Sequence, residues 1–141
     1  DITQLVAFYN NLIVFRETAI NIISFDTESY NISTITNTLG TVASKAVVVI
    51  PQLGVVFINE QGVWMLSGGL NGGASISMQK ISKPIDKLLR RVNRSMMHKA
   101  IAAYSYRERE VWMHLPTDDS TTPDTSESNV VYSYRFRNTY Q

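Results

Sequence analysis

The sequence predicts an all-β fold, an antiparallel meander that forms part of a β-propeller and contains one inserted amphipathic helix. Short apolar runs recur along most of the 141 residues, and polar or glycine-containing breaks separate them, which is the pattern of short antiparallel strands. Only the stretch 83–97 has helical periodicity instead. With 44% hydrophobic and 18% charged residues, the chain is not of the disordered class, which is apolar-poor and highly charged.

Three strands are predicted at the beginning of the chain. The apolar runs 5–9 and 12–15 flank an asparagine pair that suits a hairpin turn. A polar break follows, and then the apolar run 19–25. Residues 26–38 are rich in Thr, Ser and Asn, and we expect a loop there with one weak strand.

A second group of strands follows, separated by Pro- and Gly-containing turns. These predicted strands cover residues 45–50, 55–58, 63–66 and 74–79.

The helix is predicted from an N-terminal signal and an apolar stripe. Ser82 is a candidate N-cap, and Pro84 lies in the first turn, where its missing N–H costs little. Four aliphatic residues then share one helical face at i, i+3, i+4 and i+7. They are Ile85, Leu88, Leu89 and Val92.

Three further strands are predicted at 100–106, 111–115 and 130–136. Between the last two, residues 116–128 contain two prolines, four acidic residues and many Ser and Thr. We expect this stretch to be a polar acidic loop.

A weak internal repeat is the reason for expecting a propeller. Apolar strands that start at Ile20, Val63 and Val111 each follow another apolar run, and their starts lie 43 and 48 positions apart. A period of about 40–50 residues with a few strands per unit is typical of propeller blades. Three units are fewer than the roughly four to eight blades of a closed propeller, so other sequence or other subunits would complete it. An irregular meander is the alternative.

The repeat also predicts a core. Large apolar residues at matching strand positions are expected to form the interior of the blades. They are Val63, Trp64, Leu66, Val111 and Trp112.

No residues predict catalysis, a cofactor or a metal site, so the chain is not expected to be an enzyme. His98 is expected at the surface and His114 partly packed, and neither has a second ligand at metal-binding spacing. The Gly-rich patch 68–73 lacks the Lys of a phosphate-binding loop. Asp118, Asp119 and Asp124 lack the Gly and terminal Glu of a calcium loop. The absence of cysteine excludes disulfides and thiolate metal sites.

The net charge of +1 conceals two opposite local charges. The stretch 80–99, called the basic segment below, has seven basic residues and only Asp86 as an acid. Contacts with another subunit or with nucleic acid phosphates are predicted for it, and a solvated helix face is the alternative. The candidate contact residues are Lys83, Lys87, Arg90, Arg91 and Arg94.

Two observations concern location. No run approaches the roughly 18 uncharged apolar residues of a membrane span. The first residue is Asp1, and no basic region or cleavage motif follows it, so no signal peptide is expected. We expect the chain to be a processed product or a fragment.

Short motifs carry a resemblance to a known family. In chain order they are 40–48, 54–58, 62–64, 81–86, 90–93, 102–104 and 111–112. They form a strand, a "G-hydrophobic-F" strand, a "GV-aromatic" strand, an "I-S-x-x-I-D" helix and an "AxY…W" hairpin. This order is similar to the C-terminal propeller region of the tail nozzle proteins (tail tubular protein B) of short-tailed bacteriophages.

The resemblance implies a structural virion component rather than an enzyme. It implies a homohexameric tube below the portal, made in the host cytoplasm, through which phage DNA leaves, with adaptor subunits and tail fibres or spikes as partners. Residues 1–141 would then be a segment of a larger propeller protein. The alternative function is a receptor- or carbohydrate-binding tail module that uses aromatic residues such as Tyr132 and Tyr134.

Overall fold

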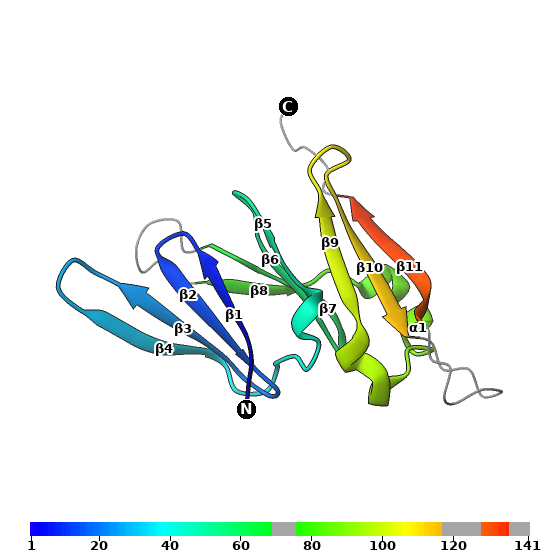
Figure 1. Ribbon diagram of the computed structural model, residues 1–141, viewed down its shortest axis with the longest axis horizontal. Coiled ribbons are helices and arrows are strands. Elements are labelled where there is room, and N and C mark those ends of the chain that lie inside the picture. Colours follow the sequence, from blue (N-terminus) through cyan, green and yellow to red (C-terminus); the bar gives the residue numbers. More distant parts are fainter. Residues whose placement is uncertain (69–75, 117–127, 136–141) are drawn as a thin grey trace.

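The computed structural model describes residues 1–68, 76–116 and 128–135 (Figure 1). Three antiparallel sheets make up most of this part of the chain. The predicted all-β class is therefore confirmed. The predicted acidic loop at 116–128 lies, apart from its two end residues, outside the described residues.

Sheet 1 is a four-stranded meander in the order β1-β2-β3-β4. Its strands are β1 (Ile2–Phe8), β2 (Asn11–Arg16), β3 (Ile20–Phe25) and β4 (Tyr30–Thr36). The weak strand expected within 26–38 is thus β4, which pairs with β3 along its length.

Sheet 2 repeats this order with β5-β6-β7-β8. Its strands are β5 (Val47–Ile50), β6 (Gly54–Asn59), β7 (Gly62–Ser67) and β8 (Ser77–Lys80). Sheet 3 has the order β11-β10-β9. Its strands are β9 (Ile101–Ser105), β10 (Glu110–Pro116) and β11 (Ser128–Arg135).

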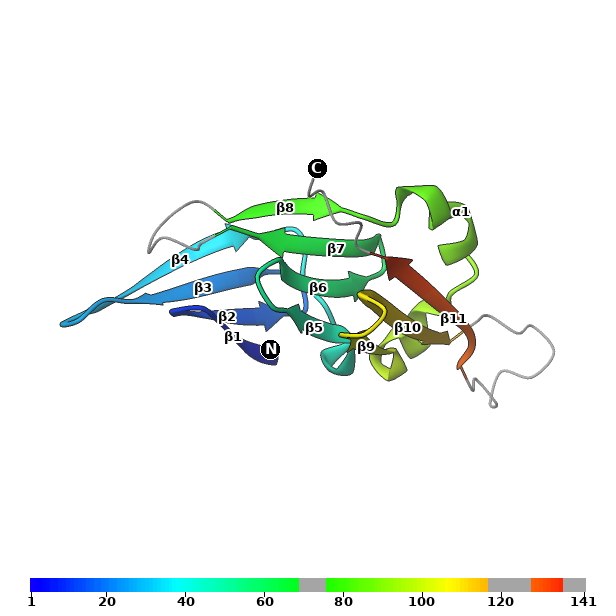
Figure 2. The ribbon, with the colours of Figure 1, turned by 90° about the horizontal axis from the view of Figure 1, so that it is seen from above.

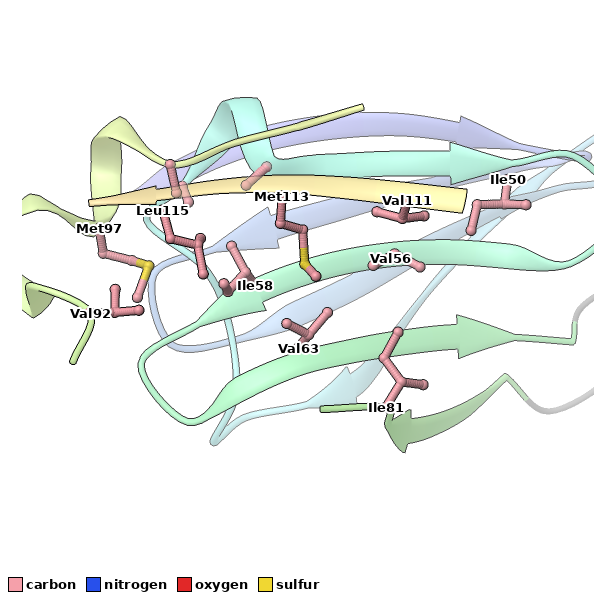
Figure 3. Close-up of a cluster of buried hydrophobic side chains, with 13 residues drawn as sticks. Ile50, Val56, Ile58, Val63, Ile81, Val92, Met97, Val111, Met113 and Leu115 are labelled. Atoms are coloured by element: carbon pink, nitrogen blue, oxygen red, sulfur yellow. The ribbon is translucent and has the colours of Figure 1, made fainter. Parts of the chain in front are cut away.

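The three sheets stack face to face, with sheet 2 in the middle (Figure 1). Every residue of β6 is buried, because side chains on the two faces of this strand point into two different cores. Phe57 belongs to the core between sheets 1 and 2, together with Phe15 and Ile20. Val56 and Ile58 belong to the core between sheets 2 and 3, together with Met113, and Figure 3 shows these side chains between the sheets.

The first strands of the three sheets lie on one side of the molecule. β1 contacts β5, and β5 contacts β9. Figure 2 shows these three strands along one edge, with β4 and β8 along the opposite edge. The sheets therefore have an inner edge, formed by β1, β5 and β9, and an outer edge.

The single helix predicted near 83–97 is wrong. The structure instead has a 3₁₀ turn η2 (Lys83–Ile85), one α-helical turn α1 (Asp86–Leu89) and a 3₁₀ helix η3 (Arg94–Lys99). Asn93 interrupts them with extended backbone, and its N–H donates to the carbonyl oxygen of Pro116 in β10 at 2.9 Å. A further 3₁₀ turn, η1 (Ser44–Ala46), precedes β5.

The predicted core residues divide between the interior and the surface. Val63, Leu66 and Val111 are almost fully buried, and Trp64 is partly buried against the core between sheets 1 and 2. Trp112, however, is 49% exposed. Its assignment to the core is wrong, because side chains alternate along a strand and Val111 occupies the buried face of β10.

Candidate interaction surface at the connection end

Two connections join the three sheets, and both lie at one end of the stack, which we call the connection end. The first connection leads from β4 to β5. The buried Thr41 donates its hydroxyl proton to the carbonyl oxygen of Ile58 at 2.6 Å, and its N–H donates to the carbonyl oxygen of Arg16. Asn59 donates its side-chain N–H to the carbonyl oxygen of Gly40 at 3.1 Å. These bonds fix the first connection to the ends of β2 and β6.

The second connection, from β8 to β9, contains most of the basic segment and is fixed to β7. The buried Ser82 accepts a hydrogen bond from the N–H of Val63 at 3.0 Å and donates one to Asp86 Oδ1 at 2.7 Å. Lys80 Nζ lies 2.9 Å from Asp86 Oδ2. The side-chain hydrogen bonds from Lys80 and Ser82 lower the pKa of the Asp86 carboxyl below its usual value.

The lowered pKa of Asp86 predicts an acid-sensitive connection. Because the folded-state pKa is below the unfolded-state value of 3.8, Asp86 stabilises the fold above that pH, and this contribution is lost as the pH falls. The midpoint of urea unfolding should therefore decrease between roughly pH 6 and roughly pH 3. In an Asp86→Asn variant this decrease should be smaller. An equal decrease in both proteins would contradict the prediction.

A cleft of about 250 Å³ opens between the basic segment and the β6–β7 turn. Lys80, Arg90 and Arg94 bring positive charge to its lining, and Glu60 and Asp86 bring negative charge. Apolar atoms of Leu89, Val92 and Met97 also line it. The cleft is therefore amphipathic, and one of its cations, Lys80, is already engaged with Asp86.

All five predicted contact residues have exposed side chains at this end of the molecule. Only two of the five, Arg90 and Arg94, line the cleft, whereas the remaining three lie outside its lining. The full set is Lys83, Lys87, Arg90, Arg91 and Arg94. The segment begins beside the outer strand β8 and ends at the inner strand β9 (Figure 2). Its charges therefore extend across the connection end and do not line the inner edge alone.

The cleft also uses residues that the sequence did not single out. Asn59 and Gln61 in the β6–β7 turn line it, and Asn59 Oδ1 also accepts hydrogen bonds from the N–H of Gln61 and from Trp64 Nε1. The sequence does show an Asn-containing turn before Gly62. It does not show that this turn contacts residues some 30 positions later, so the cleft could not be predicted from it.

Of the remaining candidate residues, the structure describes the two histidines. His98 is exposed and His114 is half-buried in β10. Within the part of the chain that the structure describes, no three His, Cys, Asp or Glu side chains are placed to hold a metal ion. The aspartates at 118, 119 and 124, and most of the Gly-rich patch, lie outside the described residues.

Of the two tyrosines proposed for the alternative function, the structure describes the side chain of Tyr134 only. Tyr134 is partly buried against the core between sheets 2 and 3. The side chain of Tyr132 lies outside the described part of the structure. Tyr106, directly after β9, is 73% exposed, and its ring centroid lies 5.0 Å from that of Tyr104.

Comparison of the chain with protein-family models and with curated proteins finds no match. In the described ranges, no helix has the length and apolar character needed to cross a membrane. The class of protein that fold and surface define is therefore an all-β protein of stacked antiparallel sheets, with a basic surface at one end.

Proposed function

We propose that this chain is a structural segment of a β-propeller in the tail nozzle of a short-tailed bacteriophage. The observation that supports this most is the arrangement of the sheets. Three antiparallel meanders stack face to face with their first strands together, which suits blades arranged around an axis. Further sheets beyond these three would complete the propeller.

In this proposal the chain has a mechanical role and no catalytic one. Sheets whose facing surfaces are closely packed resist shear, so they suit a wall that must stay rigid while DNA passes. The resemblance to the tail nozzle family, carried by motifs such as those at 40–48, 54–58 and 81–86, implies six subunits around a lumen, with adaptor and fibre or spike proteins as further partners. The protein would be made in the host cytoplasm and act in the virion.

The basic segment would provide the contact surface. Its exposed lysines and arginines lie at an end of the stack, not between the sheets. This position suits a neighbouring acidic subunit or the phosphates of DNA in the assembled lumen. Binding to DNA phosphates would be independent of sequence, because the phosphate backbone is the same for all sequences.

The native mass and shape of the purified full chain test the proposal. We expect native mass spectrometry to give six copies and negative-stain electron microscopy to show a ring with a central pore. A single copy without a ring would contradict a nozzle. Specific glycan binding by such a single copy would favour the alternative of a carbohydrate-binding tail module.

A further inference from the structure

The outer face of sheet 1, turned away from sheet 2, carries a row of apolar side chains. Register places Ala7, Leu12, Ile23 and Ile32 opposite one another in a row across all four strands. Alternation puts this row on the face opposite the buried core residues, and Ile32 is 59% exposed.

A neighbouring row on the same face of sheet 1 contains Leu5, Val14, Asn21 and Thr34. Leu5 is 54% exposed, whereas its register partner Val14 is 9% exposed. The Asn21 side-chain N–H donates to the Thr34 hydroxyl oxygen at 3.0 Å. The outer face of sheet 1 thus has an apolar row beside a half-polar one, and neither row carries a charge.

The outer face of sheet 3 combines exposed apolar side chains with one ion pair. Trp112 is 49% exposed and pairs in register with Ala103. Ile101 is 46% exposed and pairs with His114. The acid beside them, Glu110, is held by Trp112 Nε1 at 2.9 Å and by Arg135 at 2.7 Å.

The stack itself shows how such faces are covered. Sheet 1 packs its forward face, the one toward later strands, on the backward face of sheet 2. Sheet 2 packs its forward face on the backward face of sheet 3. Among the described residues, two faces are therefore left uncovered, the backward face of sheet 1 and the forward face of sheet 3. The forward face of sheet 3 could therefore pack on the backward face of sheet 1 in the same way as the sheets within the chain pack on one another.

From this we infer that two copies of the chain bind head to tail. The outer face of sheet 3 in one copy covers the outer face of sheet 1 in the second copy. The inner strands β9 and β1 would then be neighbours, as β1 and β5, and β5 and β9, already are. This continues the packing already present within the chain.

Two copies bring together six sheets, within the range of roughly four to eight blades that closes a propeller. A head-to-tail contact forms a closed ring when its rotation permits. The inference rests on the propeller part of the proposed function and is independent of the phage assignment. Six copies around a lumen would be three such pairs.

Single substitutions on the two inner strands test the pairing in the full-length chain. Leu5→Glu places a charge on the outer face of sheet 1, and Ile101→Glu places one on the outer face of sheet 3. Both residues are about half exposed in one copy, so both variants should fold, which circular dichroism and thermal unfolding check. Leu53→Glu, at a 43% exposed position in the β5–β6 turn and on neither face, is the matched control.

Sedimentation equilibrium should give a single copy for each single variant, because its substituted face can no longer pair, whereas the Leu53→Glu control should keep the wild-type mass. A mixture of Leu5→Glu and Ile101→Glu should associate into pairs of two copies, because the intact sheet 3 face of the first variant and the intact sheet 1 face of the second still form one contact.

Three results would overturn the inference: a wild-type chain that sediments as a single copy, a mass reduced by only one of the two substitutions, or a mixture that fails to associate. The nozzle proposal can fail separately, if pairs form but no pore-containing particle of six copies does.

Discussion

Replacing Phe57 by alanine is expected to lower the free energy of unfolding by about 3–5 kcal/mol. Phe57 lies in β6, the strand buried on both faces, and its side chain has no solvent exposure. Its ring centroid is 5.2 Å from that of Phe15 in an edge-to-face arrangement. The substitution therefore leaves a cavity between sheets 1 and 2 that the surrounding strands cannot close easily.

Chemical denaturation followed by tryptophan fluorescence measures this loss, with Trp64 as a reporter beside the same core. Tyr106→Ala is the control, because it also removes an aromatic ring but at a 73% exposed position, and it should cost less than about 1 kcal/mol. Similar losses for the two variants would mean that packing between the sheets does not determine stability.

Strand positions could be predicted from the sequence because they depend on local patterns. Apolar runs, asparagine and glycine turns and the spacing between them are visible along the chain. The faces of the strands could not be assigned in the same way. Adjacent residues Val63 and Trp64 both contact a core, because sheet 2 is covered on both sides. In the part of the chain that the structure describes, sheet 3 is covered on one face only, so of the adjacent residues Val111 and Trp112 only Val111 contacts a core.

The predicted repeat units match equivalent hairpins in sheets 1 and 2, but the third unit matches a different hairpin of sheet 3. The first two repeat units correspond to the hairpins β2–β3 and β6–β7, but the third corresponds to β9–β10, the first hairpin of its sheet. The extra length between Val63 and Val111 reflects the long connection that contains the basic segment. A simple spacing cannot separate an insertion of this kind from a longer repeat.

The helix prediction was wrong for a non-local reason. Leu89 and Val92 do contact the core, as the apolar stripe requires, but Leu88 is 46% exposed. The backbone hydrogen bond between Asn93 and Pro116 pulls the chain into an extended conformation at that point. Asn93 Oδ1 then accepts the N–H of Ser95 at 3.1 Å and starts η3 as an N-cap. The predicted contacts of the basic residues stay a prediction, and the cleft that Arg90 and Arg94 line was not predicted.

Replacing four residues of the basic segment, Lys87, Arg90, Arg91 and Arg94, by serine is expected to abolish most binding to double-stranded DNA. All four side chains are exposed, so the fold should be retained. Each lost phosphate contact should reduce the slope of log K against log salt by about 0.9. Fluorescence anisotropy with labelled duplexes of two unrelated sequences, each measured over a series of salt concentrations, gives both the affinity and this slope.

Matched double variants separate local contacts from total charge. Arg90→Ser with Arg94→Ser and Arg107→Ser with Arg109→Ser each remove two positive charges, the first pair beside the cleft and the second in the β9–β10 turn at the opposite end. Because screening limits exposed charges to a range of about 10 Å, only the first pair should weaken binding and reduce the salt slope. Equal losses of DNA affinity in the two double variants would mean that binding depends on the net charge of the protein and not on local contacts. Unchanged affinity in the fourfold variant would leave a protein surface, and not DNA, as the partner of the basic segment.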